Sequence, residues 1–144
     1  MHVSALVVCD AVTQREGLLN LLGGGVTYLS RASYPAPLMA DIAVLVNHQQ
    51  SDKHIKLTLT LRKDGSPEVL TETEFEGELA ETNLDPSVYG AAAFAIEARS
   101  IALPSAGNYT LTAELQDGQG LTTNFTAVEA PFPVGVDHEQ QPAT

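Results

Sequence analysis

A strict alternation of apolar and polar residues in the middle of the chain most strongly limits the folds available to it. Aliphatic residues occupy every second position of the segment 54–62, and histidine, lysine, threonine and arginine lie between them. This period of two is typical of a half-buried β-strand and not of a helix, whose period is 3.6. Similar segments, separated by turn residues, recur along the chain and predict about eight strands. We therefore expect an all-β protein, an antiparallel β-sandwich of two sheets.

The residues after this strand complete a predicted hairpin. Asp64-Gly65-Ser66 has the composition of a three-residue turn whose glycine takes a positive φ. Symmetric closure predicts four pairs on the outer face: Arg62 with Glu68, Thr58 with Glu72, Lys56 with Glu74, and His54 with Glu76.

The second strand of this hairpin carries an acidic ladder, which consists of Glu72, Glu74, Glu76 and Glu78. Two of these glutamates face a lysine or a histidine, so we expect a solvated and partly compensated surface. A contact for a cation or a basic partner is the alternative, because Glu72 and Glu78 have no assigned basic partner. The four glutamates are therefore candidate interaction residues.

Residues 3–30 predict two long apolar strands, 3–12 and 18–30, joined by a polar turn at 13–17. Symmetric closure places Val12 opposite Leu18 and Val8 opposite Leu22, and leaves both faces of the hairpin largely apolar. A strand at the surface of a two-layer sandwich needs one solvated face. Either the hairpin is covered on both sides within the monomer, or one face contacts another subunit. The candidate contact residues are Leu6, Val8, Leu18 and Leu22.

Glycines and prolines mark the changes of direction that follow. Gly23-Gly24-Gly25 predicts a bend or bulge; a phosphate-binding loop is disfavoured because no helix start or Gly-Lys-Ser/Thr follows. Residues 34–37, which contain two prolines, predict a crossover to the opposite sheet. A third strand at 38–47 and a polar turn at 48–52 come next.

The second half of the chain predicts a loop at 83–87 and a strand at 91–103, although its alanine run is also compatible with a helix. The segment 103–109 then resembles the corner of immunoglobulin-like sandwiches, in which a tyrosine, here Tyr109, anchors a turn. We expect a sandwich domain over residues 1–130. Residues 131–144 have no apolar period and predict a flexible tail, disordered unless a partner holds it.

The sequence contains none of the motifs of common catalytic or cofactor sites: no Gly-x-Ser-x-Gly, His-Glu-x-x-His, Cys-x-x-Cys or dinucleotide fingerprint. The single cysteine, Cys9, lies among apolar residues, where we expect burial to raise its pKa. His48 and His54, with Asp52 between them, form a weak metal constellation. Asp64, Asp85, Asp117 and Asp137 lie in predicted loops or the tail and bind calcium only if several meet. We expect no enzyme activity, cofactor or metal.

The net charge of −11 disfavours nucleic acid and anionic membranes as partners. No basic region precedes the first apolar run, so no signal peptide is predicted, and no apolar run approaches the ~20 residues of a membrane-spanning helix. We expect a cytoplasmic protein, or one associated with a virion if a phage encodes it.

Three segments together resemble a family of small uncharacterised bacterial proteins: Ala5-Leu6-Val7-Val8-Cys9-Asp10-Ala11-Val12, Gly17-Leu18-Leu19-Asn20-Leu21-Leu22-Gly23-Gly24-Gly25 with the prolines Pro35 and Pro37, and the corner at 103–109. The resemblance implies a compact β-sandwich, and it transfers no functional residue because no activity is known for that family.

The function that we expect is that of a non-enzymatic structural or protein-interaction module. Its partner is a second copy of the chain or a component of a larger bacterial or phage assembly. The alternative is a sandwich that binds a small molecule, a carbohydrate or calcium through its loops. The absence of tryptophan weakens the carbohydrate version, because sugar-binding platforms rely on aromatic rings.

Overall fold

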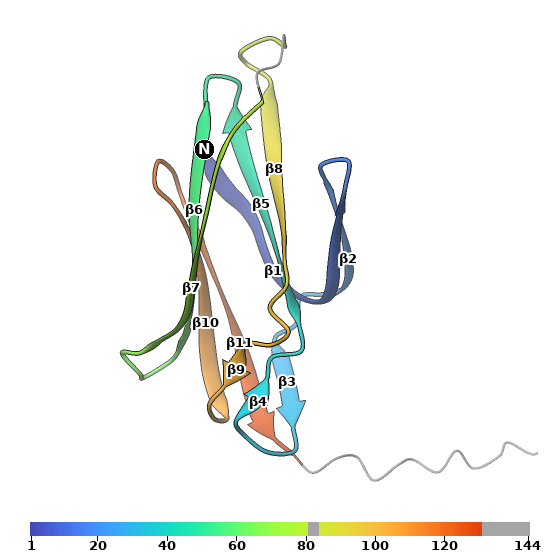
Figure 1. Cartoon of the computed structure of the whole chain (residues 1–144), viewed down its shortest axis with the longest axis vertical. Helices are drawn as coiled ribbons and strands as arrows, with labels where there is room; N and C mark the ends of the chain where they lie inside the picture. Colours follow the sequence, from blue (N-terminus) through green and yellow to red (C-terminus); the bar gives the residue numbers. More distant parts are fainter. Residues whose placement is uncertain (81–83, 131–144) are drawn as a thin grey trace, which may run out of the picture.

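The computed structural model describes residues 1–80 and 84–130, and all regular structure within them is β-strand (Figure 1). The strands are β1 (His2–Arg15), β2 (Leu18–Gly24), β3 (Tyr28–Arg31), β4 (Ala36–Pro37), β5 (Asp41–Gln49), β6 (His54–Lys63), β7 (Val69–Glu78), β8 (Tyr89–Ile96), β9 (Ala102–Leu103), β10 (Gly107–Leu115) and β11 (Leu121–Glu129). No helix within these residues has the length and apolar character needed to cross a membrane. The predicted tail lies outside the described residues.

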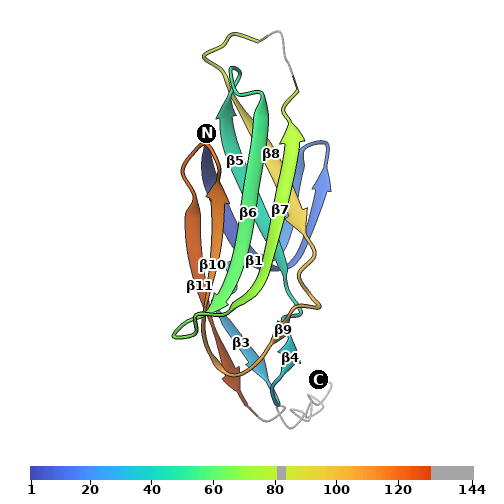
Figure 2. The ribbon, with the colours of Figure 1, turned by 60° about the vertical axis from the view of Figure 1, so that its left-hand side comes forward.

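The strands form two main sheets that face each other (Figures 1 and 2). The first sheet has the order β2-β1-β5-β8, and the second has the order β3-β11-β10-β6-β7. Pairing is antiparallel except between β11 and β3. The core between the sheets includes Val8, Ile42 and Val44 from the first and Leu57, Leu111 and Phe125 from the second. The all-β prediction is confirmed; the likeness to immunoglobulin domains stays a prediction.

The strand with the clearest alternation, β6, lies inside the second sheet and buries Ile55, Leu57, Leu59 and Leu61. Its predicted pairing with β7 is wrong by two residues, because Lys56 pairs with Glu76 and Thr58 with Glu74. Pro67 has no N–H and cannot join the ladder, and a bulge lies between Leu61 and Arg62. The connection is therefore longer than a three-residue turn. A shift of two residues keeps every side chain on its predicted face.

The N-terminal hairpin also differs from its predicted register. β1 continues to Arg15, and the turn consists of Glu16 and Gly17, with φ angles of 52° and 74°. Two positive φ angles are characteristic of the tight type I′ hairpin turn. Leu22 consequently pairs with Ala11 and Leu18 with Arg15, so the predicted pairs of Leu22 with Val8 and Leu18 with Val12 are wrong.

The second apolar strand does not run to residue 30, because the glycines take the chain out of the first sheet. Gly23 and Gly25 have φ angles of 60° and 82°, which an L residue adopts only at a cost. The amides of Gly25 and Val26 both donate to the carbonyl oxygen of Val8. The chain then enters the second sheet as β3, so the predicted bend is confirmed.

Two short segments outside the main sheets, 34–37 and 99–103, lie next to each other. After β3 the segment 34–37 returns the chain to the first sheet, as predicted, and β4 pairs with β9. The predicted strand 91–103 is wrong in its second half, since β8 ends at Ile96. The backbone of 99–101 pairs instead with the segment before β5: Ile101 and Arg99 accept hydrogen bonds from Leu38 and Met39.

The predicted tyrosine corner is present as a local contact. The Tyr109 side chain is buried, and its hydroxyl group donates to the carbonyl oxygen of Ser105 at 2.5 Å. Its ring stacks on Phe125, with 5.2 Å between the ring centroids. Tyr109 therefore anchors the turn before β10 to the core, as the sequence predicts.

Candidate functional site

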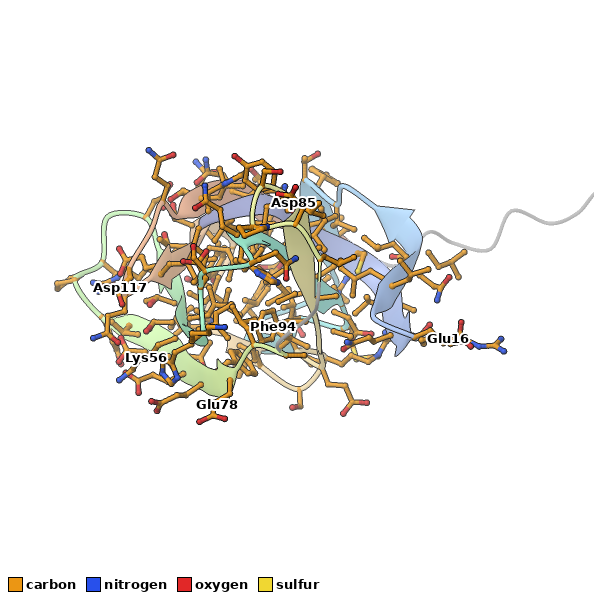
Figure 3. The ribbon with its side chains drawn as sticks, turned by 90° about the horizontal axis from the view of Figure 1, so that it is seen from above. Glu16, Lys56, Glu78, Asp85, Phe94 and Asp117 are labelled. Carbon is orange, nitrogen blue, oxygen red and sulfur yellow. The ribbon has the colours of Figure 1, made fainter. Side chains whose placement is uncertain are left out.

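The most distinctive surface feature is an arm, which we define as residues 10–24: the last part of β1, the tight turn and β2. β1 pairs with β5 only as far as Cys9, and from Cys9 onward it pairs with β2. At this change of partner the hairpin leaves the sheet and stands over its outer face (Figure 1). Figure 3 shows Glu16, at the tip of the arm, on the opposite side of the molecule from Lys56 and Glu78.

A cluster of polar groups fastens the base of the arm. The Nη1 atom of Arg99 donates to the carbonyl oxygen of Asp10 at 2.6 Å and lies 3.7 Å from Oδ2 of Asp41. The same Oδ2 atom accepts a hydrogen bond from the amide of Val12 at 3.4 Å. Asp41 is buried, and its Oδ1 atom has no hydrogen-bond partner among the described residues. These contacts tie both sides of the bend in β1 to the body of the fold.

Cys9 lies at the same bend and is 0% exposed. Burial raises the pKa of its thiol, and the carboxylates of Asp41 and Asp10 raise it further. Its Sγ atom lies 3.5 Å from the carbonyl oxygen of Asp41. The predicted direction of the pKa shift is confirmed, and the thiol is held in the protonated form that is a poor nucleophile.

An apolar groove of about 510 Å³ separates the arm from the first sheet. Its floor comes from β1, β5 and β8 and its wall from the arm; the lining residues are Ala5, Val7, Gly17, Leu18, Leu19, Asn20, Leu21, Ala43, Leu45 and Ala91. None of them is charged, and Asn20 alone has a polar side chain. The alanines of the floor are small and leave space beneath the arm.

The two faces of the arm have different surroundings. Leu19 and Leu21 share one face, and a Leu21 methyl group and a Val7 methyl group both lie next to Gly24. Leu18 and Leu22 lie on the other face and are 69% and 70% exposed, although Leu18, next to the turn, also borders the groove. Leucines therefore lie on both faces, but the prediction that both faces are largely apolar holds only in part, because the observed register puts Arg15 and Asn20 on the same face as Leu18 and Leu22. One face covers part of the first sheet within the monomer, and the other meets solvent.

The other two candidate contact residues of this hairpin lie elsewhere. Leu6 and Val8 are 8% and 2% exposed and belong to the core between the sheets. Both precede the bend in β1, where the strand is still part of the first sheet. Of the four candidate contact residues, only Leu18 and Leu22 therefore lie on the exposed surface of the arm. The bend itself had one sequence signal, the glycines that pair near Cys9.

The acidic ladder lies exposed on β7, at an edge of the second sheet. Oε2 of Glu74 is 3.5 Å from Nζ of Lys56, and Oε1 of Glu76 is 3.1 Å from Nε2 of His54. Both predicted charge pairs are thus present, although as diagonal neighbours of the observed register. Glu78 pairs across the strands with His54, and Glu72 with Thr60.

Comparison with known proteins places the chain in a family. Residues 4–141 match the profile of a family of unknown function, DUF6941. The chain belongs to DUF6941. No curated protein and no solved structure matches it. The predicted resemblance to a family without known activity is confirmed, and the matched range includes the whole arm.

His48 and His54 of this DUF6941 chain do not converge on one site in the structure. His48, expected in an exposed turn, is instead buried, with Nδ1 3.1 Å from the carbonyl oxygen of Gln49. His54 pairs with Glu76, and Asp52 accepts a hydrogen bond from the amide of Gln49. Within residues 1–80 and 84–130, no three histidine, cysteine or acidic side chains converge as metal ligands.

The loop aspartates are also separated. Asp64 accepts a hydrogen bond from Thr110. Asp85 accepts hydrogen bonds from the side chain and the backbone of Ser87, which lower its pKa. Asp85 and Asp117 lie apart in Figure 3, and Asp137 lies outside the described residues. This arrangement does not favour the calcium alternative.

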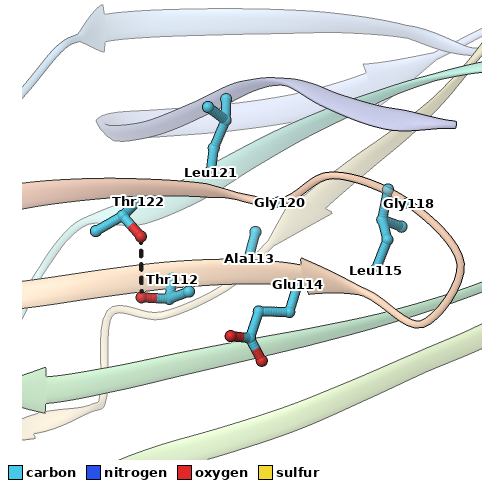
Figure 4. A pocket seen from close by; sticks show the side chains of 8 residues that line it. All are labelled: Thr112, Ala113, Glu114, Leu115, Gly118, Gly120, Leu121 and Thr122. Carbon is cyan, nitrogen blue, oxygen red and sulfur yellow. Dashed lines mark hydrogen bonds between the residues drawn. The ribbon is translucent and has the colours of Figure 1, made fainter.

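A second hollow, of about 460 Å³, lies along the β10–β11 hairpin (Figure 4). Its lining is more polar than that of the groove and includes Thr112, Glu114 and Thr122. The two threonine hydroxyl groups are 3.3 Å apart and bond to each other. Glu114 is the one ionisable side chain of the lining, so the hollow has no acid–base pair.

Proposed function

We propose that this DUF6941 protein is a non-enzymatic structural or interaction module that contacts its partner through the arm and the apolar groove. The partner is a second copy or a component of a larger bacterial or phage assembly. The exposure of Leu18 and Leu22, at 69% and 70%, is the observation that carries the proposal.

The free energy of burying these leucines supports the proposal. Apolar surface gains about 25 cal/mol for each Å² removed from water, so a projecting arm with two exposed leucines is stabilised when a partner covers it. Two large aliphatic side chains that are exposed on one projecting element are candidates for a protein contact. The core of the monomer already includes Leu6 and Val8. Leu18 and Leu22 are not part of that core.

Charge supports an apolar protein partner over a charged one. The chain has a net charge of −11, yet the lining of the groove contains no charged residue. Nucleic acids and anionic membranes require basic surfaces. The groove lining has no basic residue, and the one arginine of the arm, Arg15, lies next to Glu16. An apolar protein surface is the partner that this chemistry fits.

The test compares complexes isolated from cells of the source organism. A double variant, Leu18→Gln with Leu22→Gln, removes the apolar outer face of the arm. Tyr28→Gln is the matched control, because Tyr28 is also 62% exposed but lies on β3 of the second sheet. Native mass measurement of the tagged chain gives the result.

We expect the wild-type chain and the Tyr28 variant to occur in a complex larger than the 15.2 kDa monomer, and the arm variant to be lost from it. A complex that forms equally well with the arm variant, or the absence of any complex with the wild-type chain, would contradict the proposal. Circular dichroism of the purified variants checks that they fold.

A further inference from the structure

The edge strand β8 lacks the charge and proline that protect many edge strands against pairing, although the arm contacts it. Edge strands present unpaired N–H and C=O groups, and proteins protect them with charge, proline, bulges or short length. β3 has four residues, β7 carries the acidic ladder, and β2 ends in glycines with Gly23 at a φ of 60°. β8 has eight residues and contains neither a charged residue nor a proline.

The free side of β8 is open within the part of the chain that the structure describes. β8 pairs with β5 over its whole length, from Tyr89 to Ile96. Its residues make no backbone hydrogen bond to any other described segment. In Figure 1 β8 lies in the opposite layer from β7. One row of backbone groups on β8 therefore has no hydrogen-bond partner among the described residues.

The side chains of β8 also suit a partner strand. On the inner face, Phe94 packs against Phe75 with 5.6 Å between the ring centroids, which anchors the strand to the core. The outer face carries Ala91, Ala93 and Ala95, which allow close approach. Alanine has a low preference for strands, so a strand of this composition that is paired on one side only is weakly held. Pairing on the second side would stabilise it.

We propose that β8 pairs antiparallel with β8 of a second copy of this chain around a two-fold axis, joining two first sheets into one continuous sheet. This proposal rests on the interaction role proposed above and names its partner. A two-fold axis brings the same surface of both copies together, so the contact must be self-complementary. β8 is uncharged and carries alanines on its outer face, which meets that requirement.

Charge favours β8 over β7 as the strand through which two copies of the chain meet. Two chains of charge −11 repel each other, and pairing through β7 would bring two acidic ladders together. Pairing through β8 brings two uncharged strands together. The contact is continuous with the apolar groove, because Ala91 lines that groove. Both grooves and both arms then lie on the same face of the joined sheet.

Single cysteines on β8 test the register of this contact in the purified full-length chain. The native cysteine, Cys9, is 0% exposed, so wild-type protein under mild copper-phenanthroline oxidation is the control and should form no covalent dimer. The variants are Ala91→Cys, Ala93→Cys and Ala95→Cys, used alone and in pairwise mixtures. Directly opposed residues of antiparallel strands have Cβ atoms about 4.5–5.5 Å apart, which is near disulfide range.

Two-fold pairing predicts that the residue numbers of every crosslinked pair add to the same total. If Ala93 lies on the axis, for example, Ala93→Cys crosslinks alone, whereas Ala91→Cys and Ala95→Cys crosslink only when mixed. Crosslinks without a constant total, or no crosslinks, would overturn the proposal.

Sedimentation equilibrium provides the second readout. We expect wild-type protein to sediment at twice the chain mass of 15.2 kDa, and Ala95→Glu to lose the dimer because it places carboxylates on both paired strands. Thr73→Glu, at an exposed position on β7, is the matched control and should remain dimeric. Circular dichroism verifies folding.

A purified wild-type chain that sediments as a monomer at high concentration would overturn the second-copy proposal. If the arm-dependent native complex still forms in that case, the interaction role stands and the partner is another protein. If that complex is also absent, both proposals fail.

Discussion

At the scale of single residues, two glycines show how differently the same residue type can matter. A Cβ atom at Gly120, in the turn before β11, would collide with the backbone carbonyl oxygen of Ala113. A Cβ atom at Gly77, in β7, would meet nothing within 4 Å. Neither glycine has a positive φ, so the difference is steric and not conformational.

We therefore predict that Gly120→Ala lowers the free energy of unfolding by about 1–3 kcal/mol, as overpacking does elsewhere. Gly77→Ala should be neutral or stabilise by about 0.4–1 kcal/mol, because it restricts the unfolded chain. Urea denaturation measures both. Equal effects of the two substitutions would show that the β10–β11 turn has room that the structure does not show.

The buried thiol predicts a pH dependence of stability. Because the pKa of Cys9 is raised in the folded state, the folded chain keeps this proton where the unfolded chain has lost it. Its contribution to stability is complete below the unfolded pKa of about 8.5 and declines as the pH rises above that value.

The stability difference between the wild type and Cys9→Ala should therefore shrink between about pH 8 and about pH 10. Urea titrations at several pH values measure this difference. Tyrosines and lysines titrate in both chains, so their contributions cancel when the two free energies of unfolding are subtracted. A difference that stays constant or grows with pH would contradict a buried, protonated thiol.

At the scale of elements, the arm depends on one charged contact at its base. Arg99 bonds to the Asp10 backbone on the arm and lies near the buried carboxylate of Asp41. The arginine is 46% exposed, so solvent screens its attraction for Asp41. The contact should hold the arm over the groove more than it stabilises the whole fold.

Arg99→Gln should lower the free energy of unfolding by about 1 kcal/mol and increase hydrogen exchange of the amides in residues 10–24. Amides of β6 should exchange as in the wild type. Arg62→Gln, at an exposed arginine of β6, is the matched control. Unchanged exchange in the arm of the Arg99 variant would mean that the bend in β1 is held by the glycines alone.

The pairing of strands shows what could be predicted from sequence. The period of two correctly assigned the faces of β6 and β7, because alternation follows from backbone geometry. The register was not predictable from that period, since it depends on Pro67 in one hairpin and on the positive φ of Glu16 in the other. Nothing in the type of residue 16 signals that conformation.

The candidate site was predictable only in part for the same reason. That leucines lie on both faces of the arm follows from the consecutive leucines at 18–19 and 21–22. The separation of Leu18 and Leu22 from Leu6 and Val8 depends on the bend at Cys9, where β1 changes its partner. That change depends on contacts between segments far apart in the sequence. The nearby glycines indicate a bend, but they do not indicate which strand bends.

At the scale of the whole molecule, charge and apolar surface are segregated. The acidic ladder lies on the second sheet, whereas the groove lining and β8, on the first sheet, contain no charged residue. The net charge of −11 keeps the chain soluble, while the uncharged side remains available for contact with an apolar partner. The central claim is that this side is covered in the native assembly.

Carbene footprinting with mass spectrometry tests that claim directly, by comparing the native complex with the chain diluted until it is a 15.2 kDa monomer. We predict that labelling of Leu18 and Leu22 falls several-fold on assembly, while labelling of Tyr28, on the other sheet, is unchanged. Equal labelling of Leu18 and Leu22 in the two states would contradict the claim.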